Sequence, residues 1–296
     1  MTETARKICK RLHAYLRMDR YTGKVHSVHP NVVYLDTSIG MVSVLTNAHC
    51  LKPFSVVVSS TKQLERFEIE EGQEVLLGEE RIEIPACGFV IDLSQATDLD
   101  LGVEVMQTLF LPTDLDIRAR HLLRLIESGG KPDDLGPLVT EARSNAYCDE
   151  VRPHLPALHT AFREQDPEAC RAAAAAIAGI GTGLTPSADE LLCGYAAGYA
   201  ALSAALGRSR QRVLSLTRET ASGAAARTTE LSAAFLLQYG EGLVSEDVFQ
   251  LLQCLFSDAS YATTVACATK IASSDGVNVL TGVYLALRHQ YGRRDA

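Results

Sequence analysis

The sequence predicts an α+β protein, with an N-terminal antiparallel β barrel or sandwich in residues 1–112 and an all-α domain in residues 113–296. Short runs of β-branched residues, separated by turn residues, fill residues 23–105, and this pattern is typical of strands. Beyond them, apolar residues recur at helical spacing. One stretch, residues 191–207, has no charged residue and predicts a central buried helix in the second domain.

Composition limits the possible functions. The chain has 296 residues, is 47% hydrophobic and has a net charge of -8, which leaves room for two domains and a sizeable core. An acidic chain without a basic stripe argues against a nucleic-acid partner. The uncharged run 191–207 is slightly short for a membrane span, so we expect no membrane segment. Scattered cysteines without a C-x-x-C pair, and a start without a secretory signal, favour a cytoplasmic protein.

In the first domain, residues 3–18 have apolar residues at helical spacing and predict an amphipathic helix. Strands are then expected at 24–28, 31–36, 41–46, 54–60, 74–78, 81–84, 89–93 and 101–105. Carboxylates are dense between Glu65 and Glu104, which predicts a solvated outer face for this part of the sheet.

The second domain is predicted to begin with a helix over residues 114–128, closed by Gly129 and Gly130. Further helical segments are expected at 132–151, 153–165, 166–179, 210–223, 227–242, 245–258, 259–274 and 275–292. These segments are rich in Ala, Gly, Ser and Thr, and such small residues let helices pack closely.

The segment most suggestive of function is GIGTGLTPSADELLCG, residues 179–194. Its three alternating glycines let the backbone adopt positive φ and let another group approach the main chain. Pro186 fixes φ before a helix start, and Ser187 with Glu190 matches the capping box, so a helix should begin near Ala188. The first amides of that helix would be unpaired and would point back at the loop, which is the geometry of an anion site.

This loop, from Gly179 to Glu190, has two interpretations. It binds a small phosphate- or carboxylate-bearing ligand, or it is a glycine-rich connection into a buried, capped helix. No lysine follows the last glycine, so it is not the phosphate loop of nucleotide hydrolases. If it binds a small anionic substrate, the contacts are expected from Gly181, Thr182, Gly183, Leu184, Thr185 and Ser187.

Two adjacent carboxylates, Asp189 and Glu190, follow in the first turn of the expected helix. Their oxygen atoms suit Mg²⁺ better than zinc, which makes them candidate metal ligands. The alternative is that they balance the helix dipole. A bound anion would need this cation, or an arginine, to offset their charge.

Arg227 and Thr228 open a later helix. Hydroxyls at a helix start are usually caps, but an arginine beside them is well shaped for phosphate or carboxylate and would supply the positive charge that the glycine loop lacks. Ser274 and Asn278 are further candidate ligand contacts, with capping as the alternative for the serine. The histidines show no zinc spacing and no nucleophile–base motif appears, so no catalytic residue is assigned.

Residues 187–194 and 275–282 resemble each other. Each has a capping residue, a polar group three residues later, then an aliphatic residue, leucine and finally glycine. We expect the two helices to start alike and to pack through Gly194 and Gly282, and a pseudo-twofold would bring their N-termini to one pocket. Convergence is the alternative, since caps and small residues recur in any helical domain.

The segment 179–194 is similar to the motif G-x-G-x-G-L-T-P-S-G-D-D-x-L-x-G of the AllH-like family. Residues 227–232 and the segment from 273 to 282 also agree with that family, and the strand-rich N-terminal region resembles it less specifically. Ala188 stands where the motif has Gly, and Glu190 where it has its second Asp. These departures add a Cβ and move a carboxylate by about one methylene, so they bear on the ligand.

The resemblance implies a subunit of oxamate carbamoyltransferase, which transfers a carbamoyl group between carbamoyl phosphate and oxamate in the anaerobic degradation of allantoin, a part of purine catabolism. It also implies a complex of three different subunits, so other subunits would be its partners. The alternatives are a non-catalytic scaffold or regulatory subunit of such a complex and, less favoured, a stand-alone enzyme or sensor for a small acid.

Overall fold

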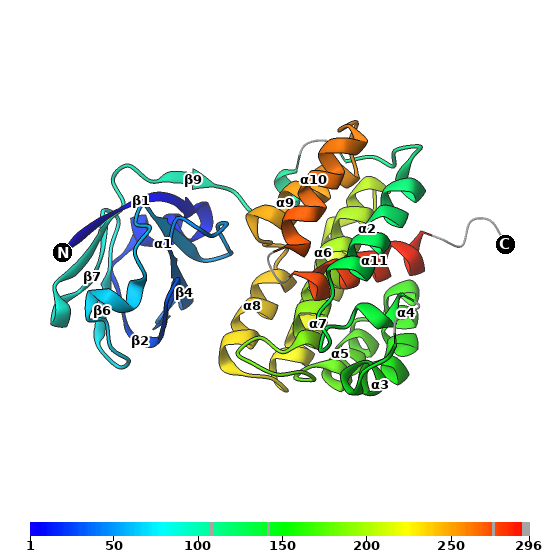
Figure 1. Cartoon of the computed structure of the whole chain (residues 1–296), viewed down its shortest axis with the longest axis horizontal. Coiled ribbons are helices and arrows are strands. Elements are labelled where there is room, and N and C mark those ends of the chain that lie inside the picture. The colour runs from blue at the N-terminus through cyan, green and yellow to red at the C-terminus, as the bar shows by residue number, and fades with distance from the viewer. Residues whose placement is uncertain (107–108, 141–142, 274–275, 292–296) are drawn as a thin grey trace. The chain divides into compact units, whose positions relative to one another are not determined.

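The computed structural model describes residues 1–106, 109–140, 143–273 and 276–291 (Figure 1). The chain divides into two compact units, Met1–Leu101 and Gly102–Ala296. The predicted boundary at residue 112 lies inside the second unit, because Val103 and Met106 pack in the helical core.

The first unit, all of whose residues are described, is a closed β barrel. Its elements are β1 (Thr2–Cys9), α1 (Lys10–Met18), β2 (Tyr21–His29), β3 (Val32–Thr37), β4 (Gly40–Leu45), β5 (Ser55–Val58), β6 (Glu74–Leu77), β7 (Arg81–Ile84), β8 (Phe89–Asp92) and β9 (Thr97–Leu99). The strand order is β5-β4-β3-β2-β6-β7-β8-β1-β9, and pairing of β5 with β1 closes eight strands into a ring. Most pairs are antiparallel, as predicted, whereas β1–β8, β1–β9 and β4–β5 are parallel.

The predicted helix over residues 3–18 is wrong in its first half, which is strand β1. Ala5, Ile8 and Leu12 are all buried, and their spacing looks helical. A register shift between Ala5 and Lys7 breaks the alternation of the strand and brings Ala5 and Ile8 to buried positions. Pairing with β5 on one side and with β8 and β9 on the other satisfies the backbone of β1, which outweighs local helix propensity.

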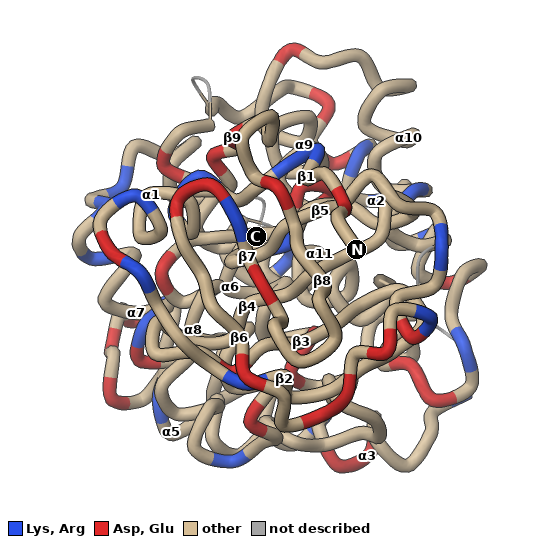
Figure 2. The backbone as a smooth tube through the Cα atoms, turned by 90° about the vertical axis from the view of Figure 1, so that its left-hand side faces the viewer, with Lys and Arg blue, Asp and Glu red and all other residues tan. Residues whose placement is uncertain are grey.

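The acidic side chains of the barrel lie mostly outside, as predicted. Figure 2 shows Asp and Glu distributed along the turns and strands of this unit. The interior is instead aliphatic, and its buried side chains include Val25, Leu35, Val42, Val75, Ile82 and Ile91.

The second unit is helical. Its helices among the described residues are α2 (Leu115–Gly129), α3 (Ala146–Val151), α4 (Leu155–Glu164), α5 (Pro167–Ile177), α6 (Ser187–Ala205), α7 (Arg210–Ala225), α8 (Glu230–Gly240), α9 (Glu246–Leu255), α10 (Tyr261–Ala272) and α11 (Val277–Gln290). Helix α6 packs against α7, α8 and α11. Fourteen of its nineteen residues are buried, which confirms the predicted central buried helix. Within the described part of the chain, no helix has the length and apolar character needed to span a membrane.

Helices α6 and α11 pack through Gly194 and Gly282, as the internal similarity predicted. A Cβ at Gly194 would overlap the backbone of Val279, three residues before Gly282. A Cβ at Gly282 would overlap the carbonyl oxygen of Leu191, three residues before Gly194. The contacts are reciprocal, as in two helices that cross about an approximate twofold axis, and they require glycine at both positions.

Candidate functional site

The glycine loop joins α5 to α6. Its glycines have φ of +80° at Gly179, +125° at Gly181 and +88° at Gly183, a region that favours glycine. A Cβ at Gly179 would lie 2.6 Å from the carbonyl oxygen of Arg227, and one at Gly181 would lie 2.5 Å from the amide nitrogen of Ser187. At Gly183 a Cβ would meet no atom within 4 Å. The loop therefore packs tightly at its start and is open at Gly183.

The start of α6 differs from the prediction. Ser187 is the first helical residue and does not cap the helix, so the predicted capping box with Glu190 is wrong. The predicted unpaired amides are also largely paired within the chain. The amide of Ala188 donates to Ile180 O, and those of Asp189 and Glu190 donate to Pro186 O. The loop folds back on the helix start and takes up donors that were expected to face a ligand.

Asp189 is only 1% exposed and accepts three hydrogen bonds. Its Oδ1 accepts from the amide of Gly179 at 2.8 Å. Its Oδ2 accepts from the hydroxyls of Thr228 and Ser232, the latter at 2.6 Å. One buried carboxylate thus ties the glycine loop to the start of α8, and the three donors offset the cost of burying its charge.

Glu190 points toward a different set of partners. Its Oε1 accepts from the Thr185 hydroxyl at 3.0 Å, and its Oε2 accepts from Asn278 Nδ2 at 3.1 Å. The same Asn278 nitrogen donates to Asp134 Oδ1 at 3.3 Å, while Asn278 Oδ1 accepts from the amide of Leu135. Asn278, which is 3% exposed, therefore joins α11 to both α6 and the segment before α3.

The N-termini of α6 and α11 come together as the internal similarity predicted, because Glu190 and Asn278 are hydrogen-bonded. The side chains of these two residues therefore link the two helix starts directly. Two helices that begin beside each other bring two positive dipole ends together, and the Glu190 carboxylate offsets them.

Some of the other predicted site residues are exposed, and others are hydrogen-bonded within the chain. Thr182, Gly183 and Leu184 are exposed, as is Arg227. Thr229 caps α8 and donates to Leu184 O at 2.7 Å, which holds the open part of the loop beside the start of α8. Ser274 lies outside the described residues.

The structure therefore brings three distant segments together: residues 179–190, the start of α8 and the start of α11. Asp134 and Ser232 complete the hydrogen bonds, and the sequence analysis did not select either of them as a ligand contact. Asp134 bonds to Asn278, 144 residues away in the chain, and Ser232 bonds to Asp189, 43 residues away. No local sequence pattern indicates hydrogen bonds between such distant residues.

A bound Mg²⁺ stays a prediction. The described residues contain no group of three His, Cys, Asp or Glu side chains arranged to hold a metal. Asp189 and Glu190 are directed at different partners, and both oxygens of Asp189 already accept hydrogen bonds. A cation at Asp189 would have to replace those donors.

Cys193 is the thiol nearest to these carboxylates in the sequence. Burial, together with the negative charges of Asp189 and Glu190, raises the pKa of the Cys193 thiol well above its usual value. The thiolate is the nucleophilic form, so this cysteine is poorly suited to attack a substrate at neutral pH.

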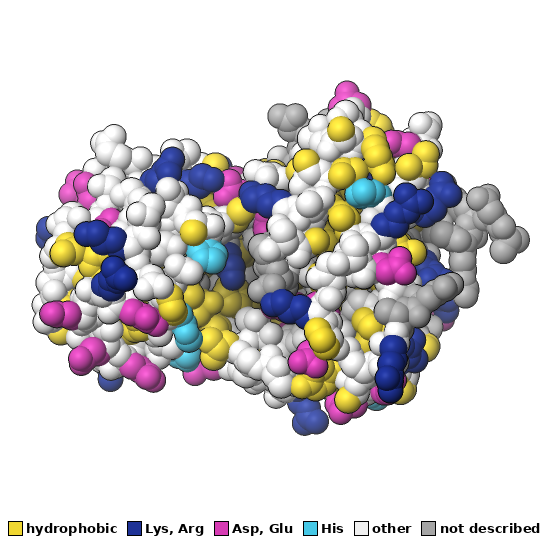
Figure 3. All heavy atoms as spheres, viewed as in Figure 1, with side chains coloured by type: hydrophobic (Ala, Val, Ile, Leu, Met, Phe, Trp, Pro, Cys, Tyr) yellow, Lys and Arg dark blue, Asp and Glu magenta, His cyan; other side chains and the backbone are white. Residues whose placement is uncertain are grey.

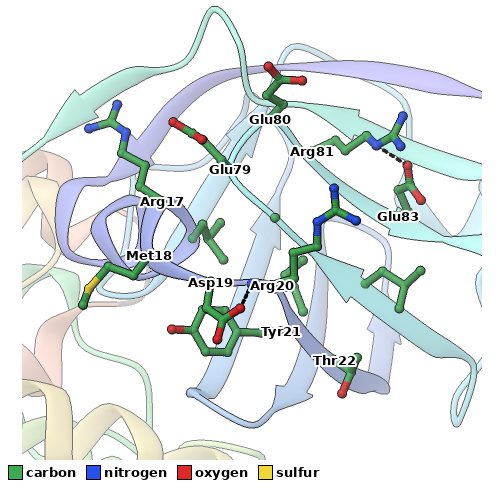
Figure 4. A pocket seen from close by; sticks show the side chains of 14 residues that line it. Arg17, Met18, Asp19, Arg20, Tyr21, Thr22, Glu79, Glu80, Arg81 and Glu83 are labelled. Carbon is green, nitrogen blue, oxygen red and sulfur yellow. Dashed lines mark hydrogen bonds and ion pairs between the residues drawn. The ribbon is translucent and has the colours of Figure 1, made fainter.

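Both units also have concave regions away from the glycine loop. The barrel unit has an open cleft of about 920 Å³ between the end of α1, the start of β2 and the β6–β7 hairpin (Figure 4). Arg17, Arg20 and Arg81 line it together with Glu79 and Glu83, and Arg81 forms an ion pair with Glu83, so its charge is mixed. The helical unit has a smaller pocket of about 270 Å³, lined mainly by apolar residues of α6, α7 and the segment before α2. On the face drawn in Figure 3, basic and acidic side chains are interspersed.

Two regions of the chain match models of known protein families. Residues 177–287 match the family model described as oxamate carbamoyltransferase subunit AllH, and residues 4–98 match the AllH family N-terminal domain. The comparisons with curated proteins and with solved structures gave no match. The two matched regions correspond to a subunit of a carbamoyltransferase, which is a transferase that works with other subunits. The chain belongs to the AllH family.

Proposed function

We propose that this chain is a cytoplasmic subunit of an oxamate carbamoyltransferase that binds a small phosphate- or carboxylate-bearing ligand at the loop between Gly179 and Glu190. The reaction joins the carbamoyl carbon of carbamoyl phosphate to the nitrogen of oxamate, and phosphate leaves with the proton that the nitrogen loses. Partner subunits supply the rest of the active site. The setting proposed for this activity is the anaerobic degradation of allantoin.

One observation carries the proposal: Asp189 and Glu190 hold three sequence segments together at the loop. Asp189 binds the start of the loop and the start of α8, and Glu190 binds the start of α11 through Asn278. The loop between these anchor points is thereby preorganised. Preorganised N–H and O–H donors are what an anionic substrate and a developing oxyanion require.

The ligand is proposed to approach at the open part of the loop. Thr182, Gly183 and Leu184 are exposed, and the space beside Gly183 is free of other atoms within 4 Å of a Cβ position. Arg227 is exposed on the segment that packs against Gly179, so its guanidinium supplies positive charge to the same end of the unit. Carboxylates Asp189 and Glu190 act here as positioning groups rather than as ligands of the substrate.

A specific observation also favours a scaffold or regulatory role. The amides at the start of α6 and both oxygens of Asp189 are hydrogen-bonded within the chain, as a purely structural helix start would be. In that case the partner subunits bind carbamoyl phosphate and oxamate, and this chain orders them.

Ligand binding by the isolated chain distinguishes these two functions. We expect urea unfolding, followed by far-UV circular dichroism at constant temperature, to require more urea when phosphate, carbamoyl phosphate or oxamate is present. A ligand at 100 times its Kd stabilises the native state by about 2.7 kcal/mol. A parallel series with Mg²⁺ tests whether the cation adds to this effect. Constant temperature is needed because heating decomposes carbamoyl phosphate.

Two matched pairs of variants locate the binding. Gly183→Ala should abolish ligand stabilisation, whereas Gly207→Ala should not; both glycines have positive φ and open space at the Cβ position, so the backbone strain is comparable. Arg227→Ala should weaken binding at least tenfold, whereas Arg212→Ala, at an exposed arginine of α7, should leave it unchanged. If no ligand protects the chain and the assembled complex keeps its activity with Gly183→Ala and Arg227→Ala, the scaffold role replaces the binding role.

A further inference from the structure

Two thiols of the helical unit face each other outside the site described above. Cys254 lies near the end of α9 and Cys267 in the middle of α10, and their sulfur atoms are 3.7 Å apart. All eight cysteines lie in the described residues and all are free thiols. Among them, this pair has the sulfur–sulfur contact within hydrogen-bonding distance.

The surrounding structure holds the two helices in this relation. Arg118 of α2 is 4% exposed, and its guanidinium donates to the carbonyl oxygens of Cys254, Ser257 and Ala259 and to the Thr264 hydroxyl. One buried side chain therefore binds the end of α9, the turn and the start of α10. The approach of the two sulfurs belongs to the packed fold and not to a free surface segment.

The two thiols differ in their access to solvent. Cys267 is partly exposed, whereas Cys254 is buried. Burial, and then the neighbouring Cys267, raise the pKa of Cys254 to about 11. A solvent oxidant therefore meets Cys267 first, because Cys267 is the more exposed thiol and Cys254 holds little thiolate at neutral pH. The position of Cys254, with its sulfur 3.7 Å from that of Cys267, and not its thiolate content, makes it the resolving thiol.

We propose that Cys254 and Cys267 are an oxidation site that forms a reversible intramolecular disulfide when the chain reacts with hydrogen peroxide. The Cys267 sulfur attacks one peroxide oxygen, the O–O bond breaks, and Cys267 becomes a sulfenic acid while one water leaves. The Cys254 sulfur then attacks the Cys267 sulfur, the S–S bond forms, the S–O bond breaks, and the Cys254 proton leaves in a second water. Two thiols and one peroxide thus give one disulfide and two waters.

The cross-link joins α9 to α10 across the turn that Arg118 already clamps. It closes a short loop, and a disulfide that closes such a loop stabilises the native state by restricting the unfolded chain. Oxidation should therefore raise the unfolding midpoint of the helical unit, and a dithiol reductant should reverse the rise. This property is independent of ligand binding at the glycine loop.

Peroxide titration of the full chain tests the site. We expect free thiols to fall from eight to six, with an intact mass lower by two hydrogens and a peptide cross-link between Cys254 and Cys267, all reversed by dithiothreitol. Cys267→Ser and Cys254→Ser should each prevent the cross-link, while Cys87→Ser, at another partly exposed cysteine, should leave it intact.

Identifying the cross-linked peptides of the wild-type chain after peroxide treatment tests the proposal even if a cysteine variant does not fold. A cross-link to another cysteine, overoxidation of Cys267 without a disulfide, or oxidation of Cys87 while both thiols stay reduced would each overturn the proposal. Formation of the cross-link without any rise in the unfolding midpoint would overturn its stabilising effect.

Discussion

At the scale of single residues, Asp189 joins the loop to the helices. It is buried and accepts from the Gly179 amide and from the hydroxyls of Thr228 and Ser232. All three partners are donors, so a carboxylate suits this position and a carboxamide does not. An asparagine would place its NH₂ group either at the Gly179 amide, which can only donate, or at the two hydroxyls, which would then have to turn and lose the acceptor they have now.

We therefore expect Asp189→Asn to lower the free energy of unfolding by about 2–4 kcal/mol. Urea unfolding followed by circular dichroism measures this loss. Asp133→Asn, at an exposed carboxylate of the neighbouring segment, is the control and should change stability by less than about 0.5 kcal/mol. An Asp189→Asn chain as stable as the control would show that the three hydrogen bonds contribute little.

His159 is a second residue with a measurable consequence. Its ring is 9% exposed, stacks on His289 with centroids 3.5 Å apart, and has Nδ1 3.0 Å from the Tyr195 hydroxyl oxygen. Burial, and then the neighbouring His289, lower the pKa of His159 from 6.5 to about 3. Below about pH 6.5 the unfolded chain binds a proton at this position that the folded chain does not bind, so stability falls as the pH is lowered toward 3.

The expected loss from this group is about 2 kcal/mol between pH 7.5 and pH 5. His159→Gln keeps a polar partner for Tyr195 but cannot take up this proton, so its stability should depend less on pH by that amount. His154→Gln, at a partly exposed histidine nearby, is the control. Urea unfolding at several pH values gives the comparison, and identical pH profiles for wild type and His159→Gln would contradict the assignment.

At the scale of secondary-structure elements, the α6–α11 pair depends on backbone contact. Gly194 and Gly282 each lie against the backbone of the other helix, while a Cβ at Gly198 would lie 3.1 Å from Val283 Cα. There is no room for a Cβ at Gly194 or Gly282. At Gly198 a Cβ would require Val283 to move by only a few tenths of an ångström.

Alanine substitutions at these glycines should therefore form a graded series. Gly282→Ala and Gly194→Ala should each cost about 3 kcal/mol or more, because backbone atoms must move apart. Gly198→Ala should cost about 1 kcal/mol or less, since the better helix propensity of alanine offsets a milder overlap. Thermal unfolding midpoints provide the order, and equal effects at all three positions would argue against the close crossing.

The same pair shows what the sequence can predict at this scale. The similarity between residues 187–194 and 275–282 correctly indicated two helices that pack through their glycines, because a close approach needs small residues in a local pattern. The capping box was wrong because Glu190 has better partners in Thr185 and Asn278, and the latter lies 88 residues away. Local motifs report possible hydrogen bonds, whereas distant partners decide which of them form.

Strand β1 shows why a local spacing pattern can predict the wrong element. A register shift placed its apolar residues at a spacing that resembles a helix, and only pairing with three other strands identifies it as part of the barrel. The fold class and the central helix followed from composition and periodicity, whereas the motifs raised the convergence of the loop with α8 and α11 only as one of two interpretations. The pairing partners of Asp189 and the engaged amides of α6 depend on the assembled structure.

At the scale of the whole molecule, the barrel is closed by its own strands. β1 pairs with β5 on one side and with β8 and β9 on the other, so every strand of the ring has two neighbours within residues 1–101. The eight-stranded ring therefore has no unpaired edge, and it encloses an aliphatic interior.

We expect a fragment of residues 1–101 to fold alone, with a β-type circular dichroism spectrum and one cooperative unfolding transition. A fragment of residues 10–101 lacks β1, which opens the ring, and should not unfold cooperatively. If the longer fragment has no ordered structure, the barrel requires the helical unit, and the two units are not independent domains.

The offset of 88 residues that relates Glu190 to Asn278 also relates Leu191 to Val279 and Gly194 to Gly282. Glu190 and Asn278 therefore occupy equivalent positions of the two helices and face each other across the crossing. If both positions held glutamate, two carboxylates would meet there and repel one another. A glutamate opposite an asparagine is instead a hydrogen-bonded pair, so the crossing favours different residues at the two equivalent positions.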